Sequence, residues 1–152
     1  INMSLFPQFS KPEIHHKVWG REIWICNNEQ YCGKILEFNA GASMSMHYHL
    51  LKKEHFHILS GDLEFSYIDL DKRNAPIKAF LKIGDVVEIK PGTLHKIKAI
   101  TDCRIMEVST QHFENDSYRI EPSKSPEQNG YIDYKWNKEE LEKRNLHIIN
   151  KE

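Results

Sequence analysis

Four side chains that can bind a metal ion lie at short intervals in the sequence. His47 and His49 are separated by one residue, Glu54 follows a four-residue stretch, and His95 follows a Pro-Gly-Thr turn at 91–93. Alternate side chains of a β-strand point to the same face, so His47 and His49 are predicted to present both imidazoles to one point. Glu54 can return to that point at the start of the next strand, and His95 can arrive from a different hairpin. The spacing therefore predicts one site with four ligands.

Three imidazoles and one carboxylate suit a single divalent transition metal, and Mn, Zn, Fe, Ni or Co is compatible with the set. A lone histidine in a sheet is more often a packed or hydrogen-bonded side chain, so the prediction depends on the joint pattern. An octahedral metal held by four protein groups keeps about two positions open. Two adjacent substrate oxygens, such as O1 and O2 of an open-chain aldose or ketose, would fit these positions.

The elements that must position these ligands are short strands. From about residue 18 to 108 the chain alternates apolar segments with turn residues, which is typical of an all-β sandwich or barrel. We expect antiparallel strands, closed or paired to protect their edges, at 19–26, 32–39, 44–49, 55–60, 62–69, 77–82, 85–90, 95–99 and 103–109. The 152 residues suit one domain: an N-terminal extension (1–17), a barrel (18–110) and a polar tail (111–152) that packs on it. The tail ends in a predicted short helix at 138–144, with Asn137 as N-cap.

The charges are balanced, with 21 Lys and Arg against 22 Asp and Glu. No overall field draws the protein to nucleic acid or to an anionic membrane, and no apolar run reaches the roughly 18 residues of a membrane-spanning helix. Residues 1–10 do not resemble a signal peptide. Three cysteines without CxxC spacing are expected to be reduced thiols, which favours a cytoplasmic location. A small molecule is therefore the expected partner.

The ligands and the glycines around them resemble the two motifs of the cupin superfamily. Residues 41–61 match the first motif, G-x5-HxH-x4-E-x6-G, at every fixed position. Residues 84–99 match the second motif in part, with Lys90 where the family usually has Pro and Ala99 where it often has Asn. The resemblance implies a small monocupin, a double-stranded β-helix or jelly-roll barrel, with His47, His49, Glu54 and His95 as metal ligands at its mouth.

Segments 17–22, 31–36, 53–56, 107–109 and 114–119 also resemble the sugar-isomerase branch of cupins, which includes the cupin part of type II mannose-6-phosphate isomerases and the lyxose isomerases. Those type II enzymes carry a nucleotidyltransferase domain that these residues do not contain, and commonly have Gln where this chain has His47. The resemblance implies a metal-dependent isomerase or epimerase of a sugar or sugar phosphate in carbohydrate biosynthesis. It also implies a homodimer, in which the apolar stretch 18–25 is expected to be an edge strand that pairs with the other copy.

Isomerisation of an aldose needs a base that moves a proton between C1 and C2, and Lys34 and Glu107 are the candidates for base or polarising group. If Lys34 and Glu107 face solvent, they are ordinary strand residues. If either side chain faces inward, its buried charge costs free energy, which makes the residue a functional candidate. A phosphate or carboxylate on the substrate would need a cation at the rim. Candidate substrate-binding residues, each of which can also be a plain surface charge, are Arg21, Lys52 and Arg119.

Other histidines and other functions complete the sequence hypotheses. His55 and His57 alternate with Phe56 and are expected on the outer face of their strand, and no role is visible for His112 in the tail. Two alternatives to the isomerase fit the same ligands. One is an Fe(II)-dependent dioxygenase, and the other is a non-catalytic, metal-containing sugar-binding or regulatory module. Fold alone does not choose among the three.

Overall fold

The computed structural model describes residues 5–69, 71 and 75–130, and the regular secondary structure of these residues is almost all β-strand. The predicted all-β class is confirmed, whereas the helix predicted at 138–144 lies outside the described residues. Two short 3-10 turns, η3 (Glu114–Asp116) and η4 (Glu127–Asn129), follow the long strands. The strands are β1 (Glu13–Lys17), β2 (Gly20–Asn27), β3 (Cys32–Phe38), β4 (His47–Tyr48), β5 (Glu54–Ser60), β6 (Leu63–Ile68), β7 (Pro76–Leu81), β8 (Val86–Ile89), β9 (Leu94–Ala99), β10 (Cys103–Ser109) and β11 (Tyr118–Arg119).

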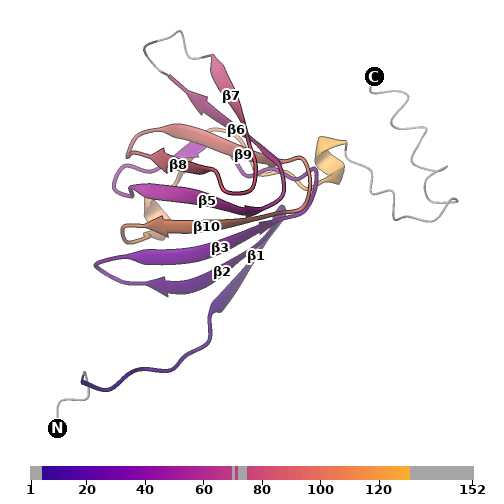
Figure 1. Ribbon diagram of the computed structural model, residues 1–152. Coiled ribbons are helices and arrows are strands. Elements are labelled where there is room, and N and C mark those ends of the chain that lie inside the picture. Colours follow the sequence, from indigo (N-terminus) through magenta and orange to yellow (C-terminus); the bar gives the residue numbers. More distant parts are fainter. Residues whose placement is uncertain (1–4, 70, 72–74, 131–152) are drawn as a thin grey trace, which may run out of the picture.

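The strands form two antiparallel sheets that enclose one interior (Figure 1). The six-stranded sheet has the order β1-β2-β3-β10-β5-β8, and the five-stranded sheet has the order β11-β4-β9-β6-β7. Sequence neighbours such as β4 and β5 therefore belong to opposite sheets. This crossing brings the two halves of the first motif to one end of the interior from both sides.

Alternation of side chains along the strands builds the core. On β10, Cys103, Ile105 and Glu107 are buried and the residues between them are exposed or half-buried. The buried apolar side chains of both sheets form one continuous cluster: Trp19, Leu36, Phe38, Ala42, Met44, Phe56, Ile58, Leu63, Phe65, Ile89, Ile97, Ala99, Cys103 and Ile105. The interior is thus a packed core at one end and a polar site at the other.

Gly61 closes the turn between β5 and β6, and only glycine fits there. Its φ is +87°, a left-handed conformation that L residues with side chains adopt at a cost. A Cβ at this position would lie 2.2 Å from the carbonyl oxygen of Asp102 and 2.8 Å from the Cys103 sulfur. The last glycine of the first motif is therefore required because the backbone of Asp102 lies too close to leave room for a side chain.

Three elements differ from the sequence expectations. β1 forms inside the segment set apart as an N-terminal extension and pairs along all of its length with β2, so 18–25 is not the edge strand that was expected. β11 forms in the polar tail and pairs with β4. The strand expected at 44–49 is reduced to β4, because Ser43 and Met44 bond irregularly to Lys98 and Ile97. Among the described residues, no helix is both long enough and apolar enough to span a membrane.

Candidate metal centre

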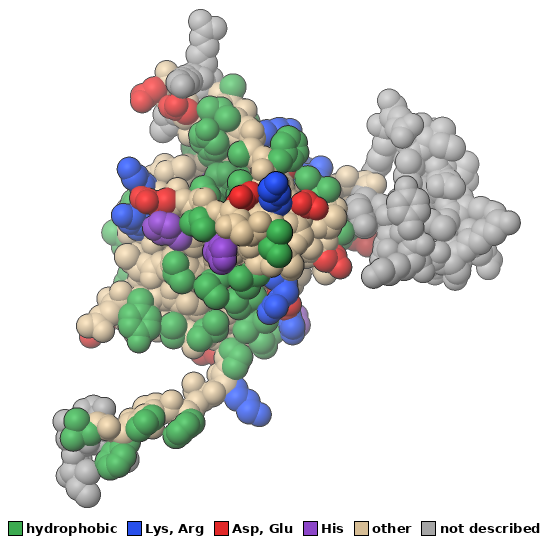
Figure 2. Space-filling view, viewed as in Figure 1, with side chains coloured by type: hydrophobic (Ala, Val, Ile, Leu, Met, Phe, Trp, Pro, Cys, Tyr) green, Lys and Arg blue, Asp and Glu red, His purple; other side chains and the backbone are tan. Residues whose placement is uncertain are grey.

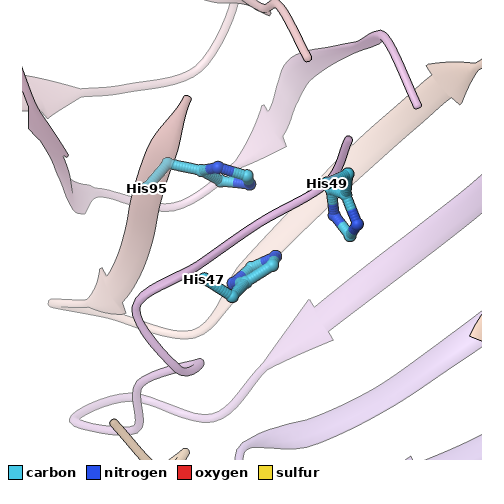
Figure 3. Close-up of side chains that lie close together, drawn as sticks. All are labelled: His47, His49 and His95. Carbon is cyan, nitrogen blue, oxygen red and sulfur yellow. The ribbon is translucent and has the colours of Figure 1, made fainter. Parts of the chain in front are cut away.

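The three histidines of the predicted site converge at one end of the barrel. His47 on β4 is the direct cross-strand partner of His95 on β9, and His49 follows His47 just beyond the end of β4. One ring nitrogen from each residue lies within 4.8 Å of the other two, and all three side chains are buried. Figure 3 shows the rings turned toward a common space between the strands. The group can hold a metal ion.

The backbone fixes the tautomer of each ring. Nδ1 of His47 lies 2.8 Å from the Ser45 carbonyl oxygen, and Nδ1 of His95 lies 2.8 Å from that of Thr93. Nδ1 of His49 lies 2.9 Å from the Asp116 carbonyl oxygen. A carbonyl oxygen only accepts, so Nδ1 carries the hydrogen in all three rings and Nε2 keeps its lone pair. This is the arrangement that a metal-binding imidazole requires.

Glu54, the first residue of β5, brings a carboxylate to the same point from the other sheet. Its Oε1 lies 3.0 Å from Nε2 of His95 and 3.7 Å from Nε2 of His49. Among the described residues, Oε1 of Glu54 and Nε2 of His95 are buried side-chain atoms without a well-formed hydrogen bond, while Oε2 of Glu54 lies 3.2 Å from Nζ of Lys52. A neutral Nε2 and a carboxylate oxygen are both acceptors, and a divalent cation between them would satisfy both. The donor set therefore fits a metal ion.

The protonation states agree with that role. Burial, together with His95, lowers the pKa of His47 to about 3, and burial with Lys52 lowers the pKa of His49 to about 4. Burial alone would raise the pKa of Glu54, but the neighbouring His95 ring and the charge of Lys52 outweigh it and leave the pKa below its usual value. At neutral pH His47 and His49 are neutral imidazoles and Glu54 is an ionised carboxylate, which are the forms that bind metals.

A buried ion-pair network continues from Glu54 into the barrel. Nζ of Lys52 lies 3.2 Å from a carboxylate oxygen of Glu54 and 3.2 Å from one of Glu107. Lys34, the direct partner of Glu107 across β3 and β10, lies 3.4 Å from Glu22 and 4.1 Å above the Trp24 ring. Both lysines and Glu107 are almost fully buried. Sequence reasoning left open whether Lys34 and Glu107 face inward, and both do.

Lys34, Lys52 and Glu107 line a single cavity with His47, His49 and Glu54. The cavity has a volume of about 70 Å³ and is bounded by Trp19, Glu22, Lys34, Leu36, Met44, Ser45, His47, His49, Lys52, Glu54, Phe56, Glu107, His112, Ser117 and Ser123. Burial and the neighbouring Glu54 raise the pKa of Glu107. The opposing charges of Glu107 and Glu54 raise the pKa of Lys52 well above its usual value despite its burial. The site thus holds a carboxylate with increased proton affinity beside a permanent cation.

Comparison with solved structures gives the fold. Two structures of the capsular polysaccharide assembling protein CapF from Staphylococcus aureus superpose with TM-scores of 0.63 and 0.65 at 19% identity, over 72% and 74% of this chain. A variant of oxalate decarboxylase from Bacillus subtilis superposes with a TM-score of 0.63 at 16% identity, over 72% of this chain. The fold is that of a cupin. No family model matches the sequence, and no curated protein matches it either.

The chain is shorter than these neighbours. It spans 34% and 32% of the two CapF chains and 30% of the oxalate decarboxylase chain. At identities below 20% the likeness establishes architecture and carries no activity. What the protein does must therefore be argued from its own site.

Two of the predicted substrate-binding cations differ from expectation. Arg21 pairs in register with Glu37 and bonds to its carboxylate on the outer face of the six-stranded sheet. The expectation that Arg21 lies at the rim is therefore corrected. Side chains alternate between the two faces of a strand, and because Glu22 and Trp24 on β2 point inward, Arg21 points outward. Lys52 is in the wall of the cavity, and not at its rim, with a side chain 4% exposed.

The third cation, Arg119, does not line the cavity but lies on the short strand that pairs with β4. It is exposed on β11 and is the cross-strand partner of His47. Directly opposed residues share a face of the sheet, so Arg119 lies on the same face as a metal ligand. As expected, His55 and His57 occupy the other face of β5.

His112 belongs to the site, although no role for it was visible in the sequence. Its Nδ1 lies 3.3 Å from Nζ of Lys52, and its ring packs edge-on against Trp24. The Asn27 side chain holds the His112 backbone by accepting from its N–H and donating to its carbonyl oxygen. Burial, with Lys34 and Lys52, lowers the pKa of His112 to about 4, so the ring is neutral. The polar tail has no periodic pattern that could have predicted this contact.

Proposed function

We propose that this cupin is a metal-dependent isomerase or epimerase of a sugar or sugar phosphate, acting in cytoplasmic carbohydrate biosynthesis. One observation carries the proposal: Lys34 and Glu107 are buried and line the same cavity as His47, His49 and Glu54. Burying an ammonium and a carboxylate is costly, and such groups concentrate where chemistry needs them. A binding module would not need a proton acceptor beside its metal.

The four ligands and the buried ion pairs have different proposed roles. His47, His49, Glu54 and His95 hold the metal, which when bound supplies Lewis-acid polarisation of a substrate carbonyl. Lys52 neutralises Glu54 and Glu107 together, because its ammonium lies 3.2 Å from each. The ligand carboxylate and the candidate base are thereby kept in fixed relation.

Glu107 is the proposed base. Its raised pKa increases the affinity of the carboxylate for a proton, which matches it to removing the proton from the carbon beside a carbonyl. The same carboxyl group then returns the proton to the former carbonyl carbon for isomerisation, whereas epimerisation would need a second acid that protonates the opposite face of the carbon. Lys34, held by Glu22 and the Trp24 ring, is the proposed donor to the substrate oxygens.

The volume of the cavity limits what can enter. A space of about 70 Å³ holds two or three water molecules at roughly 30 Å³ each. The reacting end of an open-chain sugar fits, while the rest of the sugar remains at the mouth. Arg119 on β11 is the proposed contact for a phosphate or other anionic substituent.

We also propose that the cupin is a homodimer that associates through the outer face of its six-stranded sheet. One cross-strand row on this face contains Ile14, Ile23, Ile35, Met106, His57 and Val86. Hydrophobic and histidine side chains gather over these strands in Figure 2. The neighbouring row contains Arg21, Glu37 and Arg104, joined by ion pairs. A face that carries both signs beside an apolar row can meet its own copy without net repulsion.

Assay of the metal-loaded protein against open-chain sugars tests the proposed reaction. Protein reconstituted with Mn²⁺, Co²⁺ or Zn²⁺ is incubated without oxygen with aldoses, ketoses and their phosphates, and products are identified by NMR. Interconversion of aldose and ketose, or of epimers, is expected. Turnover that consumes O2 would instead indicate the dioxygenase. Sugar binding with no conversion under any metal would indicate a non-catalytic module.

A further inference from the structure

The loop 50–53 between the ligands His49 and Glu54 is held by the segment that follows β10. All four of its backbone N–H groups donate to side chains of that segment. Leu50 donates to Oδ1 of Asp116 (2.9 Å), Leu51 to both Asp116 oxygens (3.1 and 3.2 Å), Lys52 to Oδ2 of Asp116 (3.1 Å) and Lys53 to Oγ1 of Thr110 (3.1 Å). One carboxylate therefore accepts from three consecutive loop residues.

Asp116 also orients a ligand directly. Its carbonyl oxygen accepts the hydrogen from Nδ1 of His49 at 2.9 Å, which turns Nε2 of that ring to the metal position. Asp116 is 3% exposed, whereas Leu50 and Leu51 are 55% and 66% exposed. Packing of these two leucine side chains therefore does little to shape the loop. Its conformation depends on the hydrogen bonds to Asp116.

We propose that Asp116 is a positioning residue of the metal centre, which sets metal affinity from a segment 67 residues along the chain from His49. Its carboxylate fixes the loop that separates two ligands, and its carbonyl fixes the ring of one of them. The inference rests on the metal centre of the proposed function and is independent of the reaction.

The carboxylate is the chemical group that this geometry needs. Three converging N–H donors require an acceptor on both oxygens, which only an ionised carboxylate offers. In Asp116→Asn, whichever way the amide is turned, at least one loop N–H faces an NH2 group. In Asp116→Ala all three N–H groups lose their acceptor, and the loop is free to separate His49 from Glu54. Loss of outer partners of metal ligands typically weakens metal binding by about 10–100-fold.

Titration of metal-free, full-length protein with Co²⁺ tests the proposal. Affinity is measured by competition with a chromophoric chelator, and the ligand-field absorption of bound Co²⁺ reports the geometry. Asp116→Ala is expected to weaken Co²⁺ binding by about 10–100-fold and to change the absorption spectrum. Asp116→Asn is expected to have a smaller effect of the same kind. The control Asn115→Ala, an exposed neighbour in the same turn, is expected to match the wild type.

The same titration distinguishes positioning from mere structural support. The proposal is overturned if Asp116→Ala lowers the unfolding midpoint of the metal-free protein but keeps the wild-type Co²⁺ affinity and spectrum. If the alanine variant does not fold, Asp116→Asn is judged by the same two readouts. A wild type that binds no Co²⁺ overturns the metal centre and this inference with it. A wild type that binds Co²⁺ but converts no sugar overturns the isomerase proposal alone.

Discussion

Lys34 and Glu107 are direct cross-strand partners on β3 and β10, and both side chains enter the interior of the barrel. In the buried network, Lys34 and Glu107 do not form an ion pair with each other. Lys34 is paired with Glu22, and Glu107 is paired with Lys52, which also contacts the ligand Glu54. Two opposite charges thus stand side by side on the cavity wall, one beside the metal ligands and one beside Trp24.

Replacing Glu107 by glutamine should remove turnover and spare the metal. Glutamine preserves the size of the side chain but cannot take up a proton, so kcat is expected to fall by about 10²–10⁴-fold. Metal content, measured by elemental analysis, should not change because Glu107 is not a ligand. Glu88→Gln on β8, an exposed carboxylate, provides the control. Equal kcat values for Glu107→Gln and the control would exclude Glu107 as the base.

Loss of either ligand type should abolish metal retention. His49→Ala and Glu54→Ala each remove one donor from the converging set, so neither protein should keep stoichiometric metal after dialysis. His55→Ala, on the outer face of β5, should retain as much as the wild type. Metal added at 100 times its Kd should stabilise the wild type by about 2.7 kcal/mol. Stoichiometric metal in His49→Ala would refute the ligand assignment.

The half-buried, neutral His112 should make the fold sensitive to acid. Its pKa is about 4 in the folded protein against an ordinary value of 6.5, so the unfolded chain takes up this proton first as the pH falls. The corresponding stability is present above pH 6.5 and is lost down to about pH 4, at up to about 1.4 kcal/mol per pH unit. In urea unfolding, His112→Gln should therefore lose less free energy of unfolding between pH 7 and pH 4.5 than the wild type. Identical losses in both proteins would contradict a half-buried, neutral His112.

The proposed dimer depends on the apolar row across the six-stranded sheet. Met106 lies in the middle of that row and is 36% exposed, so Met106→Arg should place a charge in the interface and yield monomers. Phe80→Arg on β7, which is 70% exposed on the other sheet, should leave the dimer intact. Sedimentation of both variants and the wild type, with circular dichroism to verify folding, measures this. A dimeric Met106→Arg or a monomeric wild type would refute the proposed face.

Two glycines with nearly the same φ should differ in their tolerance of alanine. Gly61 and Gly84 have φ values of +87° and +91°, but only at Gly61 would a Cβ collide with backbone, 2.2 Å from the Asp102 oxygen. Gly84→Ala should cost about 1–2 kcal/mol of conformational strain, and Gly61→Ala should cost distinctly more. Thermal unfolding of the two variants provides the comparison. Equal costs would show that close approach is not what requires Gly61.

The barrel and the histidine positions could be predicted from sequence because they depend on local period and spacing. His47 and His49 obey the alternation of a strand, and turn residues mark the strand ends. The inward orientation of Lys34 could not be predicted, because Lys34, Ile35 and Leu36 are all buried and give no alternation that fixes the phase of β3. Ile35 is covered on the outer face, in the row assigned to the dimer.

The contributions of the tail could not be predicted for a different reason. Asp116 and His112 act through contacts with loop 50–53, Lys52 and His49, which lie some 60 residues or more away in the chain. A short 3-10 turn and a two-residue strand leave no periodic pattern in the sequence. Only the closed barrel, which brings the end of β10 beside the start of β5, creates these contacts.

The central claim is that Glu107 moves a proton at a carbon of a sugar held by a metal-dependent site. It is tested most directly by running the metal-loaded reaction in D2O without oxygen and observing the product by NMR. The predicted result is conversion with deuterium from solvent at the reacting carbon, which disappears in Glu107→Gln. Conversion that continues at the wild-type rate in Glu107→Gln, or turnover that occurs only while O2 is consumed, would contradict the claim.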